Sequence, residues 1–214
     1  MRKFLSAIVK QDGEIICRPD VTDSHEDLID FAGLVDDGRD AFVRLEFLPK
    51  DDDFADVAAY TLVVDQTNTP DWFDDAMKER VEQSLRDRVR RMIVADDRKI
   101  LLGGCWIVVD GAKVRRTINA TLRIVGGEIK QFSGGRIALI YGGEIKQFRG
   151  GTIALIYGGT IEHLVFGTIE QILGGEIKQF YGGTIALIYG GEIERIYGGT
   201  IKQRLGGEIK DDRR

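Results

Sequence analysis

Few residues of this sequence have the types and the spacing that catalysis requires. Cys105 follows a glycine pair in "ILLGGCWIVVDG" (100–111), where it suggests a phosphate-binding loop or a cysteine nucleophile. The stretch lacks the Lys-Ser/Thr of a P-loop and the third glycine of a dinucleotide fingerprint. A cysteine followed by Trp106 and three β-branched residues is typical of a buried, unreactive strand position. We therefore expect no catalytic residue and no bound cofactor.

Two other stretches resemble cation sites. The Asp-rich "KDDDFADV" (50–57) offers carboxylates but lacks the glycine and the terminal glutamate of an EF-hand loop. Glu162 and His163 form an acid–imidazole pair, but no further histidine, cysteine or carboxylate cluster stands at ligand spacing. The other histidine, His25, is expected in the first turn of a helix. The sequence therefore predicts no metal site and no Ser-His-Asp or Cys-His arrangement.

The elements that would carry any site fall into two parts, of which residues 1–109 have the pattern of an α+β domain. A short helix is expected from Ser24, where "SHED" resembles a capping box. A longer helix is expected after "NTPDW", with Thr69 as N-cap and Pro70 at the first helical position. Strand candidates are rich in Val, Ile, Phe and Tyr, and they are Phe4–Val9, Glu14–Cys17, Ala41–Phe47, Tyr60–Val64 and Ile107–Val109.

From Gly126 onward the sequence repeats every eight residues. Isoleucines recur at this spacing without drift, and nearly all of them follow a glycine pair, the exception being Phe166–Gly167. A fixed short period of strand-forming residues and glycine turns indicates a β-solenoid, in which each coil stacks on the previous one. The eleven isoleucines are Ile129, Ile137, Ile145, Ile153, Ile161, Ile169, Ile177, Ile185, Ile193, Ile201 and Ile209.

Each octad has the form G-G-x-I-x-x-x-x, numbered 1 to 8, and we expect positions 4 and 7 in the core. Strict strand alternation would instead bury position 6, including Gln131 and Gln147, which is costly without hydrogen-bond partners. An alternative in which position 6 of every second octad lies in the core stays open. The predicted core residues are Ile129, Phe132, Ile137, Ile140, Ile145, Phe148, Ile153, Ile156, Ile177, Phe180, Ile185 and Ile188.

Octads reading "GEIKQF" alternate with octads reading "GTIALIY", so the full repeat is sixteen residues. Stacking like on like requires two octads per coil, giving about five and a half coils and a rod of roughly 26 Å at a strand spacing of about 4.8 Å. The expected fold class is an α+β N-terminal domain followed by a C-terminal β-solenoid of octapeptide repeats. We place the α+β domain at 1–109, a lead-in at 110–125 and the solenoid at 126–214.

The "GTIALIY" octads place leucine at position 6 and tyrosine at position 8, both outside the predicted core. Stacked along the solenoid, these side chains would form an apolar stripe too continuous for scattered surface residues. Leucine and tyrosine together suit a protein interface. The pattern breaks at 160–173, where polar residues replace the apolar ones. The predicted interface residues are Leu139, Tyr141, Leu155, Tyr157, Leu187 and Tyr189.

The composition narrows the possible partners. Acidic residues outnumber basic ones by 35 to 30, so the net charge of −5 gives no general reason to expect nucleic acid or anionic lipid as partner. Two cysteines are too few for a disulfide framework, and the N-terminal apolar run is too short for a signal peptide or membrane span. We expect a cytoplasmic protein. Arg204 and Asp212, at core position 7 of the last octads, are expected to stop end-to-end growth.

The run "RKILLGGCWIVVDGAKVRRTINATLRIV", preceded by "FVRLEF" and "TPDWFDD…RVRRMIV", resembles a group of uncharacterised proteins of bacteria, phages and mobile elements. These join a small N-terminal domain ending in a Gly-Gly-Cys motif to many short repeats. The repeat wording here, "GGTIALIY", departs from the polar repeats of that group. The resemblance implies a phage or mobile-element setting and carries no catalytic residue.

These observations favour a non-enzymatic binding or scaffold protein that uses the Leu/Tyr stripe for self-association or for binding a host protein, whose inhibition is one possible outcome. Two alternatives are a structural spike in which three chains share each turn and a carbohydrate-active β-solenoid enzyme, which would need paired acids in a groove. A three-chain spike gives no reason for the sixteen-residue alternation. The glutamates at 128, 144 and 176 have the pattern of a repeated surface position and not that of a catalytic pair. Mimicry of DNA is disfavoured because lysines accompany the glutamates.

Overall fold

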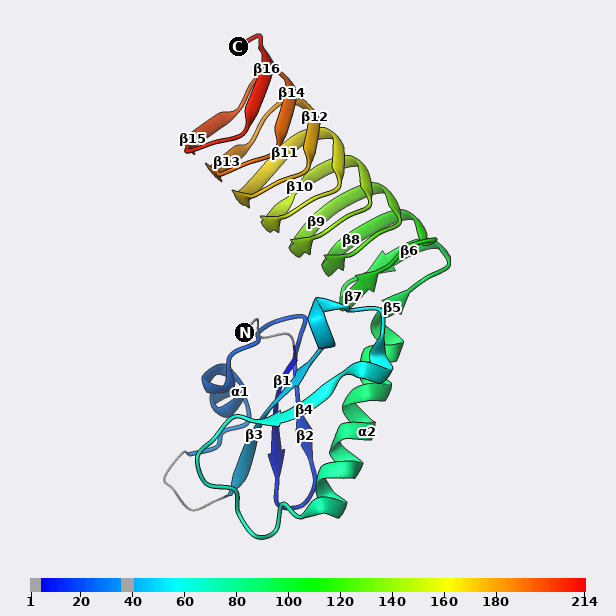
Figure 1. Cartoon of the computed structure of the whole chain (residues 1–214), viewed down its shortest axis with the longest axis vertical. Helices are drawn as coiled ribbons and strands as arrows, with labels where there is room; N and C mark the ends of the chain where they lie inside the picture. Colours follow the sequence, from blue (N-terminus) through cyan, green and yellow to red (C-terminus); the bar gives the residue numbers. More distant parts are fainter. Residues whose placement is uncertain (1–4, 36–40) are drawn as a thin grey trace. The chain divides into compact units, whose positions relative to one another are not determined.

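The computed structural model describes residues 5–35 and 41–214, and the chain divides into two compact units, Met1–Met92 and Ile93–Arg214 (Figure 1). The boundary falls earlier than the one expected after residue 109. The reason is that residues 93–108 form parallel strands that pair with each other and with residues 113–124 of the solenoid. The strand expected at Ile107–Val109 therefore belongs to the solenoid.

The N-terminal unit contains an antiparallel sheet in the order β2-β1-β3-β4. Ser6 on β1 is the register partner of Glu46 on β3, so these two polar residues face each other within the sheet. The predicted strands of this part are present, except that Phe4 lies outside the described residues. The elements are β1 (Leu5–Lys10), β2 (Ile15–Ile16), α1 (His25–Phe31), β3 (Phe42–Leu48), η1 (Lys50–Asp52), η2 (Val57–Ala59), β4 (Thr61–Val64) and α2 (Asp75–Met92).

The two helices begin with side-chain caps, one of them as predicted. Ser24 is the N-cap of α1, where its hydroxyl accepts a hydrogen bond from the N–H of Asp27. Helix α2 begins at Asp75 rather than directly after Thr69, so that prediction was wrong. Pro70 instead starts a turn, and the Asp74 carboxylate accepts the N–H of Met77 at 2.8 Å. The aspartate supplies the cap that was expected from the threonine.

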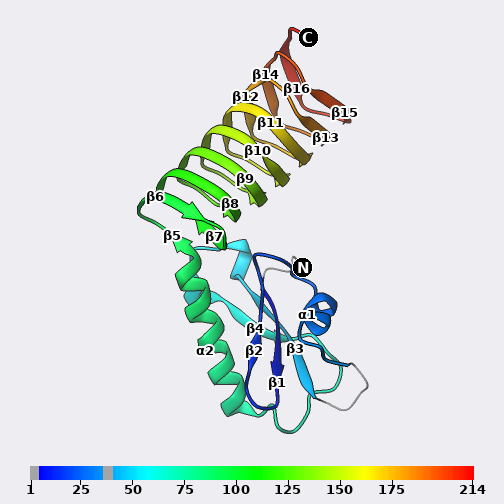
Figure 2. The ribbon, with the colours of Figure 1, turned by 180° about the vertical axis from the view of Figure 1, so that it is seen from behind.

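The second unit is a parallel β-solenoid (Figures 1 and 2). Its early coils are built from long strands that run around one corner, and its later coils from pairs of short strands. The strands are β5 (Ile93–Val94), β6 (Asp97–Leu102), β7 (Cys105–Val108), β8 (Lys113–Ile124), β9 (Glu128–Ile140), β10 (Glu144–Ile156), β11 (Thr160–Ile172), β12 (Glu176–Phe180), β13 (Thr184–Ile188), β14 (Glu192–Ile196), β15 (Thr200–Arg204) and β16 (Glu208–Asp212).

Two octads form one coil, as the sixteen-residue alternation predicted. Ile145 on β10 is the register partner of Ile129 on β9 and of Ile161 on β11, a step of sixteen residues each way. The coils therefore close within one chain. The solenoid has about 8 turns, more than the five and a half expected, because residues 93–125 form coils in which glycine pairs do not recur every eight residues.

The solenoid core consists of stacked isoleucines and phenylalanines. All twelve residues expected at positions 4 and 7 are buried and belong to one apolar cluster. The rings of Phe132 and Phe148 stack at 5.1 Å with planes only 5° apart. Identical side chains in register can stack this way because neighbouring parallel strands lie only about 4.8 Å apart.

Glycine is required at the corners by conformation and by space. Gly159 has φ +79°, and a Cβ there would lie 2.8 Å from the carbonyl oxygen of Gly143 in the preceding coil. At the opposite corner Phe166 replaces the first glycine of a pair, and its exposed ring lies over Gly150. The close approach of successive coils thus leaves room only for glycine at these corners.

The C-terminal end of the solenoid carries charges at core positions. Arg204 and Asp212 are exposed, whereas the last isoleucines, Ile201 and Ile209, are only partly buried. Hydrogen bonds from Arg214 lower the pKa of Asp212 to about 2, so its charge persists at any ordinary pH. A charged side chain at an open strand edge is a known means of preventing further strand pairing. That these charges stop end-to-end growth stays a prediction.

Candidate functional site

The outward side chains form two different faces. The "GEIKQF"-type octads, which begin at residues 126, 142, 158, 174, 190 and 206, form what we term the charged face. The "GTIALIY"-type octads, which begin at residues 134, 150, 166, 182 and 198, form what we term the Thr/Leu face. Each face stacks on itself, since Gln131 is the register partner of Gln147 and Leu155 that of Gln171. Any site built from repeats is therefore a column along the solenoid.

The predicted interface residues lie on the Thr/Leu face, with one exception. Leu155 and Leu187 are half-buried and lie outside the core cluster, so position 6 is not a core position there. Leu139 is only 6 % exposed, and its register partner on β8 is Arg123, which is itself buried. Leu139 therefore offers little surface to a partner, and its assignment to the interface was wrong.

The tyrosines at position 8 form a column that continues through residues not singled out by sequence. Tyr141 and Tyr157 stack at 5.2 Å, and Tyr189 is 47 % exposed. Leu173 and Leu205, both exposed, occupy the same position, since the N–H of each bonds to the isoleucine carbonyl of the previous coil as the tyrosines do. The predicted break at 160–173 therefore affects position 6, through Gln171, and not position 8. We term Tyr141, Tyr157, Leu173, Tyr189 and Leu205 the Leu/Tyr column.

Aromatic residues also line the corner at the end of the charged-face octads. Tyr181 and Tyr197 stack at 5.1 Å, and the ring of His163 lies 6.1 Å from that of Tyr181. This pair was not predicted from the sequence, although Tyr181 and Tyr197 stand at position 8 of their octads, as the predicted tyrosines do. A shallow cavity of about 520 Å³ lies here, lined by Gln147, Arg149, His163, Val165, Phe166 and Tyr181.

The lysines in the later coils of the charged face are ion-paired with glutamates. Lys146 lies 2.7 Å from Glu144 and 3.1 Å from Glu162, and these hydrogen bonds raise the pKa of Lys146. Glu162 also lies 3.6 Å from Lys178. Because Glu162 is held by two lysines, it does not form the acid–imidazole pair with His163 that the sequence suggested.

Three glutamates cluster farther along this face. Burial, reinforced by a hydrogen bond to Glu194 and by its charge, raises the pKa of Glu176, and Glu192 adds to the repulsion. An acid with a raised folded-state pKa favours the fold most when protonated, so its ionisation lowers stability as pH rises past the ordinary glutamate range. The cluster is thus a local source of instability at neutral pH.

We predict that Glu176→Gln stabilises the solenoid at neutral pH by less than about 1 kcal/mol, the range typical of partly exposed charges. The amide keeps the size and hydrogen-bonding capacity of the side chain but removes one of three negative charges. Urea unfolding at pH 7 and at a pH below the ordinary glutamate pKa measures the effect, and the gain should vanish at the lower pH. A variant that is less stable than wild type at pH 7 would contradict this account.

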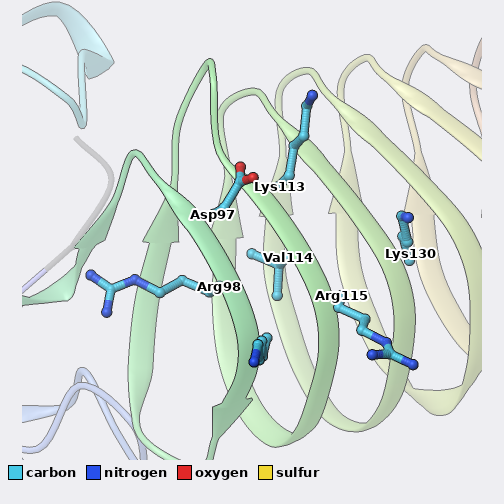
Figure 3. A pocket seen from close by; sticks show the side chains of 7 residues that line it. Asp97, Arg98, Lys113, Val114, Arg115 and Lys130 are labelled. Atoms are coloured by element: carbon cyan, nitrogen blue, oxygen red, sulfur yellow. The ribbon is translucent and has the colours of Figure 1, made fainter.

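The coils that precede the octads continue the charged face, because Lys113 on β8 is the register partner of Glu128 on β9, but their charges are arranged differently. A pocket of about 360 Å³ lies there, lined by Asp97, Arg98, Lys99, Lys113, Val114, Arg115 and Lys130 (Figure 3). Arg98 extends away from Arg115 and Lys130, and its Nε lies 2.8 Å from Asp96. Within the described part of the chain, the side chains of Lys99, Lys113, Arg115 and Lys130 form no hydrogen bond or ion pair. From the sequence, Lys99 was placed in the α+β domain, Lys113 and Arg115 in the lead-in and Lys130 in the solenoid, and no site was predicted from them.

The N-terminal unit contains a polar cluster that the sequence did not reveal. His25 is 2 % exposed; its Nε2 lies 3.0 Å from the carbonyl oxygen of Leu45, and its Nδ1 lies 3.3 Å from the carboxylate of Asp65. The hydroxyl of buried Ser6 donates to Glu46 at 2.9 Å, and Glu46 lies 3.7 Å from His25. These contacts tie α1 to β1, β3 and the residue that follows β4. Imidazole and carboxylates are also the side chains that hold divalent ions in N/O sites.

The other candidates from the sequence occupy structural positions. Cys105 is buried, and the guanidinium of Arg123 lies 3.8 Å from its sulfur. In the Asp-rich stretch, the Asp53 carboxylate accepts the N–H groups of Ala55 and Asp56 and so closes a local turn. No described helix is long and apolar enough to cross a membrane.

The fold thus defines the protein as an α+β unit joined to a parallel β-solenoid. Comparison with known proteins takes this no further: no protein family, no curated protein and no solved structure matches the chain.

Proposed function

We propose that the solenoid is a non-enzymatic protein-binding module and that the Leu/Tyr column binds a second copy of this chain. The observation that carries the proposal is the column itself: five apolar side chains, exposed or half-buried, at one position of five successive coils. Tyrosines and leucines that remain partly exposed in a continuous row suit an interface, because they bury much apolar area for little side-chain entropy.

The spacing of the column favours a second copy over another partner. Side chains repeat along the solenoid at the strand spacing of about 4.8 Å. A partner that contacts every coil in the same way must present groups at the same spacing, and a second solenoid of this sequence does so without adjustment. A two-fold pair of identical surfaces is also the commonest form of oligomer.

The charges of the Thr/Leu face are compatible with this occupant. From residue 136 to 189 its outward charged residues are Arg136 and Glu170, which lie 3.4 Å apart and so neutralise each other. The remaining outward positions carry Thr, Ala, Leu, Gln and Tyr. Within this range two such faces meet without burying an unpaired charge, which would be costly, whereas the octad that ends at Leu205 carries the exposed Lys202 and Arg204.

The experiment is the mass of the full chain in solution, by light scattering and sedimentation over a range of concentrations. We expect a concentration-dependent dimer for the wild type and a monomer for the double variant Leu155→Glu/Tyr157→Glu. The matched control is Gln147→Glu/Arg149→Glu, which changes the charged face on the same strand β10 and should still dimerise. A wild type that stays monomeric at high concentration, or a control variant that dissociates as much as Leu155→Glu/Tyr157→Glu does, would contradict the proposal.

The setting of this interaction is part of the proposal. The resemblance of residues 98–125 to proteins of phages and mobile elements supports a role of that origin in the cytoplasm, where a host protein is the alternative occupant of the same column. Because the coils close within one chain, a spike in which three chains share each turn gains no support. A carbohydrate-active enzyme also lacks a favouring observation, since Glu144 is ion-paired to its neighbour Lys146.

A further inference from the structure

Three of the four cations of the first coils lie in one column along the solenoid. Asp97 is the register partner of Lys113, and Val114 that of Ile129, so Lys99, Arg115 and Lys130 follow one another on three successive coils. Neighbouring coils lie about 4.8 Å apart, a distance at which like charges repel. Lys113 lies one outward position before Arg115 on the same strand and widens the cationic surface.

The same column shows how such charges are neutralised elsewhere. Farther along, Lys146 and Lys178 occupy the corresponding position, and both are paired with Glu162. In the first coils the carboxylates at hand are Asp97, which lines the pocket, and Glu128, the register partner of Lys113, and neither forms an ion pair with the four cations. The chain therefore pairs its lysines within the fold in the later coils and leaves them available in the first ones.

We propose that this pocket binds a short chain of phosphate groups, either inorganic or carried by a nucleotide. Amino and guanidinium groups are the side chains that recognise phosphate oxygens, and arginine does so with two parallel hydrogen bonds. A row of cations along the solenoid axis matches a ligand whose negative charges also lie in a row. The proposal is independent of the Leu/Tyr column, which lies on the other face.

Size and lining argue for this ligand over a nucleic acid strand. A pocket of about 360 Å³ lies within the range of small-molecule sites. Single-stranded nucleic acids are held by aromatic side chains on which their bases stack, whereas Asp97, Val114 and the cations that line this pocket include no aromatic ring. The pocket therefore offers cations for phosphate groups but no aromatic ring on which a base could stack.

The test is calorimetric titration of the full chain with sodium tripolyphosphate, without added divalent cations, at low and at raised salt. We expect saturable binding that weakens with salt and that falls at least tenfold in the double variant Arg115→Gln/Lys130→Gln. The control is Lys146→Gln/Lys178→Gln, which removes two lysines of the same column that are paired with glutamates and should bind as wild type does. All these side chains are exposed or half-buried, and circular dichroism checks that each variant is folded.

Further probes separate the sources of the ligand. Equal affinity for tripolyphosphate and ATP assigns recognition to the phosphate chain alone, and tighter binding of ATP assigns it to a nucleotide; both support the proposal. Absence of tripolyphosphate binding, equal loss in the two double variants, or equal affinity for single inorganic phosphate would overturn it. So would tighter binding of single-stranded DNA or of a sulfated oligosaccharide than of tripolyphosphate.

Discussion

Replacing Phe148 by alanine is expected to lower the free energy of unfolding of the solenoid by about 3–5 kcal/mol, as for other fully buried aromatic residues. The ring is fully buried and stacks on that of Phe132 in the adjacent coil. Its removal leaves a cavity that the neighbouring coils cannot close, because their spacing is fixed by backbone hydrogen bonds between parallel strands. In a stacked solenoid the loss falls on two interfaces, one on each side of the coil.

Urea unfolding followed by circular dichroism measures this effect, and Phe166→Ala is the matched control. Phe166 undergoes the same chemical change, but its side chain is 54 % exposed at a corner, so we expect a loss below about 1 kcal/mol, as for surface substitutions. A loss at Phe148 no larger than that at Phe166 would show that the stacked phenylalanines contribute little to stability.

The repeated part of the solenoid was predictable because identical residues stack on one another. Ile129, Ile145 and Ile161 stand in register one coil apart, and the alternation of "GEIKQF" with "GTIALIY" is visible in the letters alone. The first coils have the same geometry but do not repeat the octad sequence. Val114 occupies the position of Ile129, but any apolar residue suffices there, so neither the coil nor the domain boundary could be read from sequence.

The candidate sites were predictable only where the repeat places them. The Leu/Tyr column follows from the octad, although Leu173 was not predicted because the preceding outward residues, Glu170 and Gln171, are polar. Burial of Leu139 depends on Arg123, a residue that precedes the octads. The cationic pocket likewise depends on the register between β6, β8 and β9, which could not be predicted because β6 and β8 do not carry the octad repeat.

The polar cluster of the N-terminal unit is a second feature that could not be predicted from the sequence. Ser6, His25, Glu46 and Asp65 come from β1, α1, β3 and the residue that follows β4. Nothing in their spacing brings them together, since their proximity arises from the pairing of strands and the docking of a short helix. Buried polar residues of this kind are found only once tertiary structure is known.

The second large effect is expected at a corner glycine. We predict that Gly159→Ala destabilises the solenoid by roughly 2–5 kcal/mol, the sum of a left-handed backbone for a residue with a Cβ and of overpacking. The residue has φ +79°, and the new Cβ would lie 2.8 Å from the carbonyl oxygen of Gly143 and 2.9 Å from the carbonyl carbon of Gly142. These contacts are with backbone, which cannot move without separating two coils.

Gly103→Ala separates the two contributions, because Gly103 lies in the same unit with φ +54° and an added Cβ there would meet no atom within 4 Å. Its cost should be the conformational part alone, about 1–2 kcal/mol. The difference between the two variants, measured by urea unfolding, therefore reports the steric contact between stacked coils. Equal losses would mean that the coils can move apart at the corner, and steric contact between coils would then not be what requires glycine there.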